Sequence, residues 1–205
     1  MQVEDKVIAD FLATLDQTLP VTCLAIREPG PLLFCPAGLW LFQVESWNGT
    51  IVREDGVWKQ IQSVRDKLGR KQRQVQTREP APDDEWLRHK GEIEKMLSVR
   101  LPQRAWAGSL IQGGVAFTHP KASLDKPHIQ GNTAAYRTAR GWTERIRVAP
   151  AVSDFTLEIQ LEMLEALYEH PGEQAASAKD EAERLYQEAV GELRQSIAKN
   201  GELTG

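Results

Sequence analysis

The sequence predicts an α/β (α+β) fold with a mixed sheet flanked by helices and a C-terminal helical hairpin. Three observations predict it. Short apolar runs separated by turn residues fill the first part of the chain, which is typical of strands. A capped helix and another apolar run follow, in the order strand, helix, strand. Apolar side chains then recur at helical spacing through residues 151 to 205.

The first half of the chain is predicted to form sheet after one helix. Residues 3 to 15 place five apolar side chains on one helical face, which indicates an amphipathic opening helix. Strands are expected at about 21 to 26, 32 to 35 and 39 to 44, with a hairpin at 50 to 61 closed through Glu54-Asp55-Gly56.

The middle of the chain is predicted to alternate between polar loops and regular elements. The polar stretch from Ser63 to Ala81 is expected to be a loop. Asp83 or Asp84 can then cap a helix that runs to about Leu101. A strand is expected at 110 to 118, a loop that can contain short elements at 119 to 141, and a last strand at Arg145-Ile146-Arg147-Val148.

The C-terminal part is predicted to be two helices. Residues 155 to 169 fit both a strand and a helix pattern, but their leucine, glutamate, methionine and alanine content favours a helix. After the break at His170-Pro171-Gly172, residues 173 to 199 are also helical in pattern. We therefore divide the chain into a core at 1–150 and an acidic helical hairpin at 151–205.

Size and composition limit the class of protein. With 205 residues and 41% hydrophobic content, the chain can bury one core and a smaller extension. No apolar run is long enough to span a membrane and no cationic leader is present, so we expect no membrane partner and a cytoplasmic protein. Residues 151 to 205 hold 12 acidic and 4 basic residues, a net charge of −8, which leaves +4 for residues 1 to 150.

The cysteines and histidines predict neither a disulfide nor a metal site. If Glu28 pairs with Pro31 across a tight turn, Leu24 faces Cys35 and Cys23 is one residue out of register, so no disulfide is expected. The four histidines, at 89, 119, 128 and 170, have no spacing typical of metal ligands. We expect no resident cofactor.

One motif carries a resemblance to a known family. The segments are Ala37-Gly38-Leu39-Trp40-Leu41-Phe42-Gln43-Val44-Glu45-Ser46-Trp47-Asn48-Gly49 and, later, Val115-Ala116-Phe117-Thr118-His119-Pro120-Lys121-Ala122. With Glu4 in the opening helix and the hairpin that contains Trp58, this outline resembles the nuclease-related domain, a restriction-endonuclease-like family, over roughly residues 1 to 125. The resemblance implies a restriction-endonuclease-like sheet.

The resemblance also implies a catalytic motif that this chain lacks. Family members carry an Asp, then Glu-x-Lys about thirteen residues later, and the two carboxylates hold a divalent cation while the lysine acts on the attacking water. Carried over by position, the Asp falls on Gly30, the Glu on Gln43 and the Lys on Glu45. A helical glutamine of the family falls on Glu85. The resemblance therefore implies a degenerate site at Gln43 and Glu45, with Gly30 and Glu4.

A rearranged site is the alternative. Gln43 and Glu45 flank Val44 on a strand, so both side chains are expected on the same face. Glu45 with Glu28, Glu4 or Asp55 is a candidate site for Mg²⁺ or Mn²⁺, and the protein would then be an active metal-dependent nuclease.

A basic segment is the candidate nucleic-acid contact. It holds one acidic residue, Asp66, and six basic residues: Arg65, Lys67, Arg70, Lys71, Arg73 and Arg78. Such a segment suits a phosphate backbone, although basic runs are often only solvated surface. No aromatic residue lies between them, so base stacking is not indicated.

We therefore predict a catalytically degenerate nuclease-related protein that binds nucleic acid or acts as a scaffold in a DNA-processing or defence-type assembly. There are two alternatives to this prediction. One is the active nuclease described above, and the other is a purely structural subunit of a protein complex. The hairpin is expected to dock on the chain's own core, on a second copy or on another protein.

Overall fold

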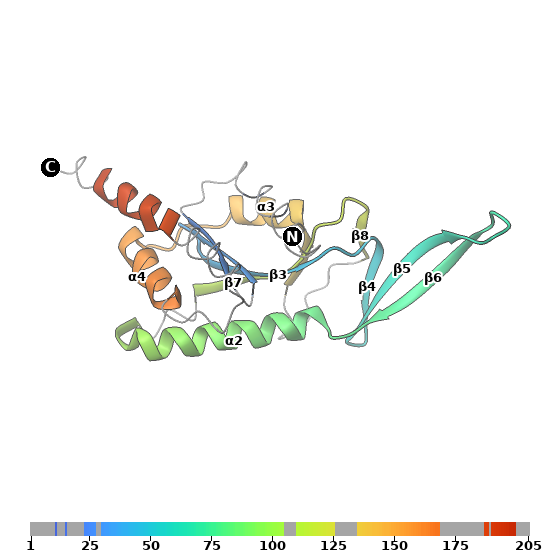
Figure 1. The fold of residues 1–205 in the computed structure, drawn as a ribbon, viewed down its shortest axis with the longest axis horizontal. Helices are drawn as coiled ribbons and strands as arrows, with labels where there is room; N and C mark the ends of the chain where they lie inside the picture. Colours follow the sequence, from blue (N-terminus) through green and yellow to red (C-terminus); the bar gives the residue numbers. More distant parts are fainter. Residues whose placement is uncertain are drawn as a thin grey trace. The chain divides into compact units, whose positions relative to one another are not determined.

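The computed structural model describes residues 11, 15, 23–27, 30–104, 110–125, 135–168, 187–188 and 190–199. The described residues form a mixed α/β fold with two sheets, each of which contains both parallel and antiparallel strand pairs (Figure 1). The predicted fold class is thus confirmed. No described helix is both long and apolar enough to cross a membrane.

The first sheet has the strand order β1-β2-β3-β7-β9. Its strands are β1 (Cys23–Arg27), β2 (Gly30–Cys35), β3 (Gly38–Glu45), β7 (Ile111–Phe117) and β9 (Ala135–Thr138). The strands predicted at 21 to 26, 32 to 35, 39 to 44 and 110 to 118 are confirmed. They were predictable because strands buried on both faces, such as most of β3, leave continuous apolar runs in the sequence.

The second sheet has the order β6-β5-β4-β8. Its strands are β4 (Gly49–Glu54), β5 (Val57–Arg65), β6 (Lys71–Arg78) and β8 (Ala122–Leu124). Asp55 and Gly56 join β4 to β5 with φ of 51° and 81°, the left-handed conformation that two-residue hairpin turns require. The hairpin predicted at 50 to 61 is confirmed.

The described helices lie where capping residues and apolar periodicity occur in the sequence. They are α2 (Pro82–Arg100), the 3-10 turn η1 (Pro102–Arg104), α3 (Ala139–Arg147), α4 (Leu157–Tyr168) and a helical segment at residues 190–199. Proline begins α2 and three acidic residues follow in its first turn, an arrangement that the helix dipole favours. The predicted helices at 83 to 101 and 155 to 169 are confirmed. Of the opening helix, only Phe11 and Leu15 are described, both helical and buried.

The chain divides into two compact units that interleave in the sequence. Unit 1 contains residues 1–18, 42–88 and 113–145, and unit 2 contains 19–41, 89–112 and 146–205. One buried hydrophobic cluster of unit 1 contains Ile51, Trp58, Val115, Phe117 and Tyr136. The sequence-based division at residue 150 stays a prediction.

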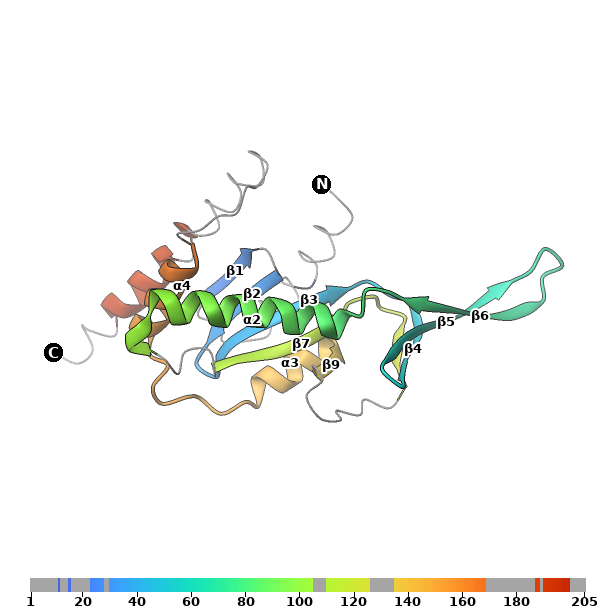
Figure 2. The same ribbon diagram turned by 90° about the horizontal axis from the view of Figure 1, so that it is seen from below.

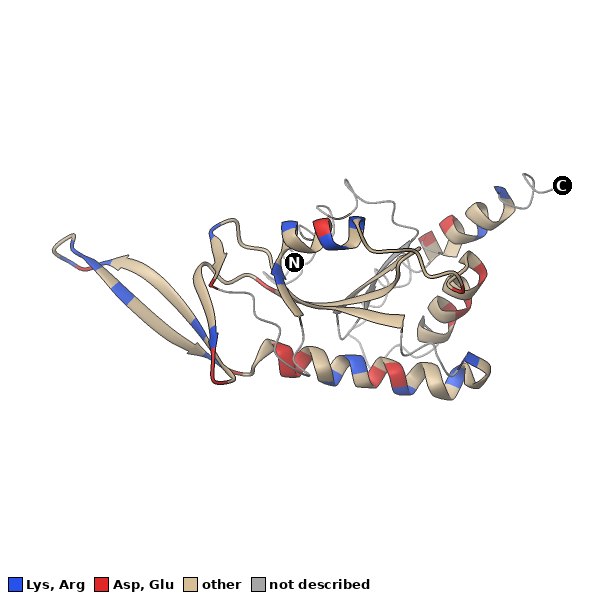
Figure 3. Cartoon of the chain, turned by 180° about the vertical axis from the view of Figure 1, so that it is seen from behind, with Lys and Arg blue, Asp and Glu red and all other residues tan. Residues whose placement is uncertain are grey.

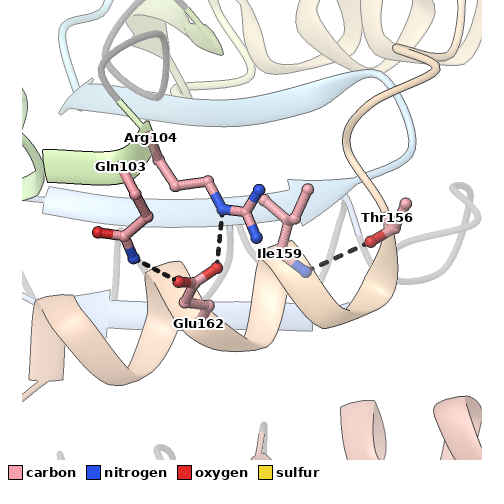
Figure 4. A network of polar contacts seen from close by, with 5 residues as sticks. All are labelled: Gln103, Arg104, Thr156, Ile159 and Glu162. Atoms are coloured by element: carbon pink, nitrogen blue, oxygen red, sulfur yellow. Dashed lines mark hydrogen bonds and ion pairs between the residues drawn. The ribbon is translucent and has the colours of Figure 1, made fainter. Parts of the chain in front are cut away.

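Within unit 2, polar contacts join α4, the first helix of the predicted C-terminal hairpin, to η1 (Figure 4). Arg104 Nε lies 2.9 Å from Glu162 Oε2, and Gln103 Nε2 donates to Glu162 Oε1 at 2.9 Å. The Thr156 hydroxyl accepts a hydrogen bond from the Ile159 amide at 3.5 Å, which caps the start of α4. An ion pair of 3.3 Å between Arg194 and Glu165 joins the helical segment 190–199 to α4. Of the two predicted helices of the hairpin, the first is confirmed as α4; for the second, residues 187–188 and 190–199 are helical and the rest of its range lies outside the described residues.

Three local predictions are wrong. The stretch from Ser63 to Ala81 is not a loop, because residues to Arg65 extend β5 and Lys71 to Arg78 form β6. Residues 145 to 147 belong to α3 rather than to a strand, since Trp142 and Ile146, four residues apart, are both buried on one helical face.

The third error concerns β1 and β2. The predicted pairing of Glu28 with Pro31 is replaced by Arg27 opposite Gly30, which puts Cys23 opposite Phe34. Cys23 is still one residue out of register with Cys35. Cys35 is a free, buried cysteine.

Candidate functional site

Gln43 and Glu45 lie on the same face of β3, as their spacing predicts, and a third residue joins them. Gln43 Nε2 donates to Glu45 Oε1 at 3.2 Å and to Glu85 Oε2 at 3.3 Å. Glu85 comes from the first turn of α2, so the amide of Gln43 bridges two carboxylates from different elements. We call Gln43, Glu45 and Glu85 the amide cluster. It occupies three positions at which the nuclease-related resemblance places functional residues.

The amide cluster changes the acidity of Glu45. Burial raises the pKa of the Glu45 carboxyl above its ordinary value of 4.5, and repulsion from Glu85 raises it further. The hydrogen bond from Gln43 opposes this shift, as does the positive charge of Arg78. The ionised form of Glu45 is therefore less favourable in the folded protein than in the unfolded chain.

The raised pKa of Glu45 makes the stability of the folded protein depend on pH. Since the folded protein retains the Glu45 proton to higher pH, the contribution of Glu45 to stability is greatest below pH 4.5 and falls as the pH rises through the folded-state pKa. We expect Glu45→Gln to raise the melting temperature relative to wild type at neutral pH, and to give no such gain near pH 4.5. Thermal unfolding at both pH values checks this. A gain of equal size at both would contradict it.

Arg78, whose charge acts on Glu45, is the last residue of β6. Its Nε donates to Gln60 Oε1 at 2.9 Å, and its guanidinium lies 5.3 Å from the ring centroid of Trp47. Gln60 is buried and donates to the backbone oxygen and side-chain oxygen of Asn48, each at 2.8 Å. Arg78 is therefore half-buried and held by contacts with Gln60 and Trp47, whereas Arg65, Lys67, Arg70, Lys71 and Arg73 are exposed.

The amide cluster has an N–H donor between its two carboxylates. Magnesium and manganese require several oxygen ligands, whereas the group between Glu45 and Glu85 is the NH₂ of Gln43, which donates hydrogen bonds. In the part of the chain that the structure describes, no group of three or more His, Cys, Asp or Glu side chains is arranged to hold a metal.

The remaining predicted positions are not brought into the amide cluster. Gly30 is the first residue of β2, opposite Arg27, and belongs to unit 2, whereas the cluster belongs to unit 1. Asp55 occupies the exposed β4–β5 turn. Glu4 and Glu28 lie outside the described residues.

The basic segment forms a two-stranded antiparallel ribbon, β5 with β6. Beyond Ile61, β5 pairs with no described strand other than β6 (Figure 2). Side chains of a strand alternate between its two faces, and directly opposed residues share a face. The register therefore separates a basic face, with Arg65, Lys71 and Arg73, from a glutamine face. The glutamine face carries Gln60, Gln62, Gln72, Gln74 and Gln76, together with Trp58, Val64 and Arg78.

The basic face concentrates exposed positive charge. Arg65, Lys71 and Arg73 are all exposed, and Arg65 is directly opposite Lys71. Like charges at opposed positions of a ribbon repel each other. Neither Arg65 nor Lys71 is in an ion pair with any described residue. In Figure 3 the basic positions continue to the turn of the ribbon. An anion held between these side chains would relieve the repulsion.

Comparison with known protein families, with curated proteins and with solved structures finds no match to this chain. The resemblance to the nuclease-related domain therefore stays a prediction.

The sequence alone does not predict two features: the contact of Glu85 in the amide cluster and the β5–β6 ribbon. The sequence shows Glu85 as a departure from the family pattern, but its contact with Gln43 joins residues 42 positions apart, which no local spacing reveals. The ribbon had a visible signal, since basic residues at 71 and 73 alternate with glutamines at 72, 74 and 76. A period of two in polar residues indicates a strand with two different solvent faces.

Proposed function

We propose that this chain is a non-catalytic protein of the nuclease-related type that binds nucleic acid, rather than acting only as a scaffold in a DNA-processing or defence-type assembly. The basic face of the β5–β6 ribbon is its contact surface. The observation that carries this proposal is the set of exposed cations on one face, with Arg65 directly opposite Lys71.

Charge supports a phosphate backbone as the ligand. Residues 65 to 73 hold five basic residues and one acidic residue, Asp66. The Asp66 carboxylate accepts hydrogen bonds from the backbone N–H groups of Leu68 and Arg70 at 2.9 and 2.8 Å. Its negative charge therefore stabilises the turn between β5 and β6. Each phosphate neutralised by a lysine or arginine releases counterions, which favours binding at low salt.

The amide cluster supports the absence of catalysis. A nuclease of the implied kind needs two anionic metal ligands and a cationic residue beside the attacking water. Here Gln43 is neutral, and an acidic residue, Glu45, occupies the position of the cation. The Gln43 amide is already bonded to both carboxylates.

Binding and cleavage measured on the same samples test the proposal. We expect a labelled DNA duplex to show increased fluorescence anisotropy with the full chain at low salt, and to remain uncut with Mg²⁺ or Mn²⁺. Cleavage that Glu45→Ala abolishes would instead support the active-nuclease alternative. No binding to duplex or single strands would leave the structural-subunit alternative, which purification with co-eluting protein after nuclease treatment would support.

A further inference from the structure

The tip of the ribbon presents one apolar side chain in a defined position. The Asp66 amide donates to the Arg70 carbonyl at 2.9 Å, so three residues, Lys67 to Gly69, form the turn. Gly69 has a φ of 77°, the left-handed conformation typical of the last position of such a turn. The Asp66 carboxylate accepts the Leu68 amide from within the turn, which holds the backbone of Leu68 in place.

Leu68 is exposed where turn residues are ordinarily polar. Its relative exposure is 73%, the highest among the large hydrophobic residues of the described chain. Lys67 and Arg70, on either side of it, are also exposed. The tip therefore combines one apolar side chain with flanking positive charge, and this chemistry is complementary to a base stack with phosphates on both sides.

We propose that Leu68 is a wedge that inserts between base pairs of duplex DNA and bends it when the basic face engages the backbone. The inference rests on the proposed function. Many proteins that bind the minor groove insert a Leu, Ile, Phe, Met or Pro side chain between base pairs, which partly unstacks them and kinks the duplex by roughly 20–90°. Lys67 and Arg70 would then contact the phosphates that flank the opened step.

The distribution of charge favours DNA over a membrane surface. Strand geometry separates residues 71 and 73 by about 6.6 Å, twice the rise per residue, and the charges extend from the tip along the strands. A linear array of phosphates matches this extension, whereas a membrane-binding element needs a broad apolar face. Leu68 at the tip and Val75 on β6, which is 51% exposed, together offer too little apolar surface for stable insertion into a bilayer.

The test measures DNA bending separately from DNA binding. A short duplex carrying a fluorescence donor and acceptor at its ends is titrated with the full wild-type chain and with Leu68→Ser. We expect the wild type to increase energy transfer, and Leu68→Ser to bind within about tenfold of wild-type affinity without the increase. Val99→Ser, at a 72% exposed position of α2, is the matched control and should bend DNA like wild type.

The remaining results distinguish failure of the wedge from failure of the proposed function. Wild-type binding without bending, or full bending by Leu68→Ser, would overturn the wedge while leaving the proposed function intact. No binding by any of the three proteins would contradict the proposed function, and the wedge with it. Binding of the wild type to vesicles of phosphatidylserine and phosphatidylcholine that Leu68→Ser abolishes, with no bending of DNA, would overturn the wedge and assign the tip to a membrane.

Discussion

Replacing Lys71 and Arg73 together by glutamine is expected to weaken binding to duplex DNA roughly a hundredfold at low salt. Both residues are exposed on the basic face, and each is expected to contact a phosphate. A hydrogen bond to a charged group contributes about 1.5 kcal/mol or more, so the loss of two corresponds to about 3 kcal/mol. The loss should be similar for duplexes of different sequence, because phosphate contacts carry no base information.

The glutamine face provides the matched control. Gln72→Ala with Gln74→Ala changes the same strand, at neighbouring positions and on the opposite face. We expect this control to bind DNA within a few-fold of wild type. Because Lys71 is opposed by Arg65, the basic-face variant should melt no lower than wild type. Anisotropy titrations of the three proteins check the prediction, and equal affinities would show that the basic face is not the contact surface.

Asp83→Ala is expected to lower the free energy of unfolding by about 3 kcal/mol. Asp83 is buried at the start of α2, where Oδ1 accepts from Trp58 Nε1 at 2.7 Å and Oδ2 lies 2.9 Å from Arg53 Nε. Trp58 is 1% exposed, so its N–H would be left without a partner, which costs about 1–3 kcal/mol. Arg53 would also lose its ion partner, a smaller loss because its side chain is 23% exposed.

The neighbouring residue controls for effects of charge on the helix. Asp84 also lies in the first turn of α2 but is exposed, so Asp84→Ala should cost less than about 1 kcal/mol. Thermal unfolding is expected to show a decrease of roughly 10 °C for Asp83→Ala and a much smaller one for Asp84→Ala. Similar decreases for both would mean that the bonds to Trp58 and Arg53 do not stabilise this region.

The parts of the fold that sequence predicts are those with apolar periodicity or caps. β3 is a buried apolar run between turn signals, and α2 combines an N-terminal proline with inward residues such as Trp86, Ile93 and Leu97. β6 was missed because it has no apolar alternation, and it forms by pairing with β5 along its whole length. Arg145 to Val148 alternates like a strand, but the burial of Trp142 and Ile146 on one side favours a helix.

The candidate site was predictable only in part. Strand pleating places Gln43 beside Glu45, and the hydrogen bond between them confirms this. The contact between Glu85 and Gln43 could not be predicted, because it depends on how α2 packs against β3 in the tertiary structure. The same holds for Arg78, which was grouped with the exposed cations by sequence but contacts Gln60 and Trp47 in the structure.

The salt dependence of DNA binding by the wild-type chain tests the central claim most directly. With about four phosphate contacts, affinity should fall roughly a hundredfold between about 50 and 200 mM salt, and the logarithm of affinity should decrease linearly with that of salt. This result is expected with an intact duplex at every salt concentration. Affinity that is independent of salt, or no binding at the lowest salt, would contradict an electrostatic contact through the ribbon.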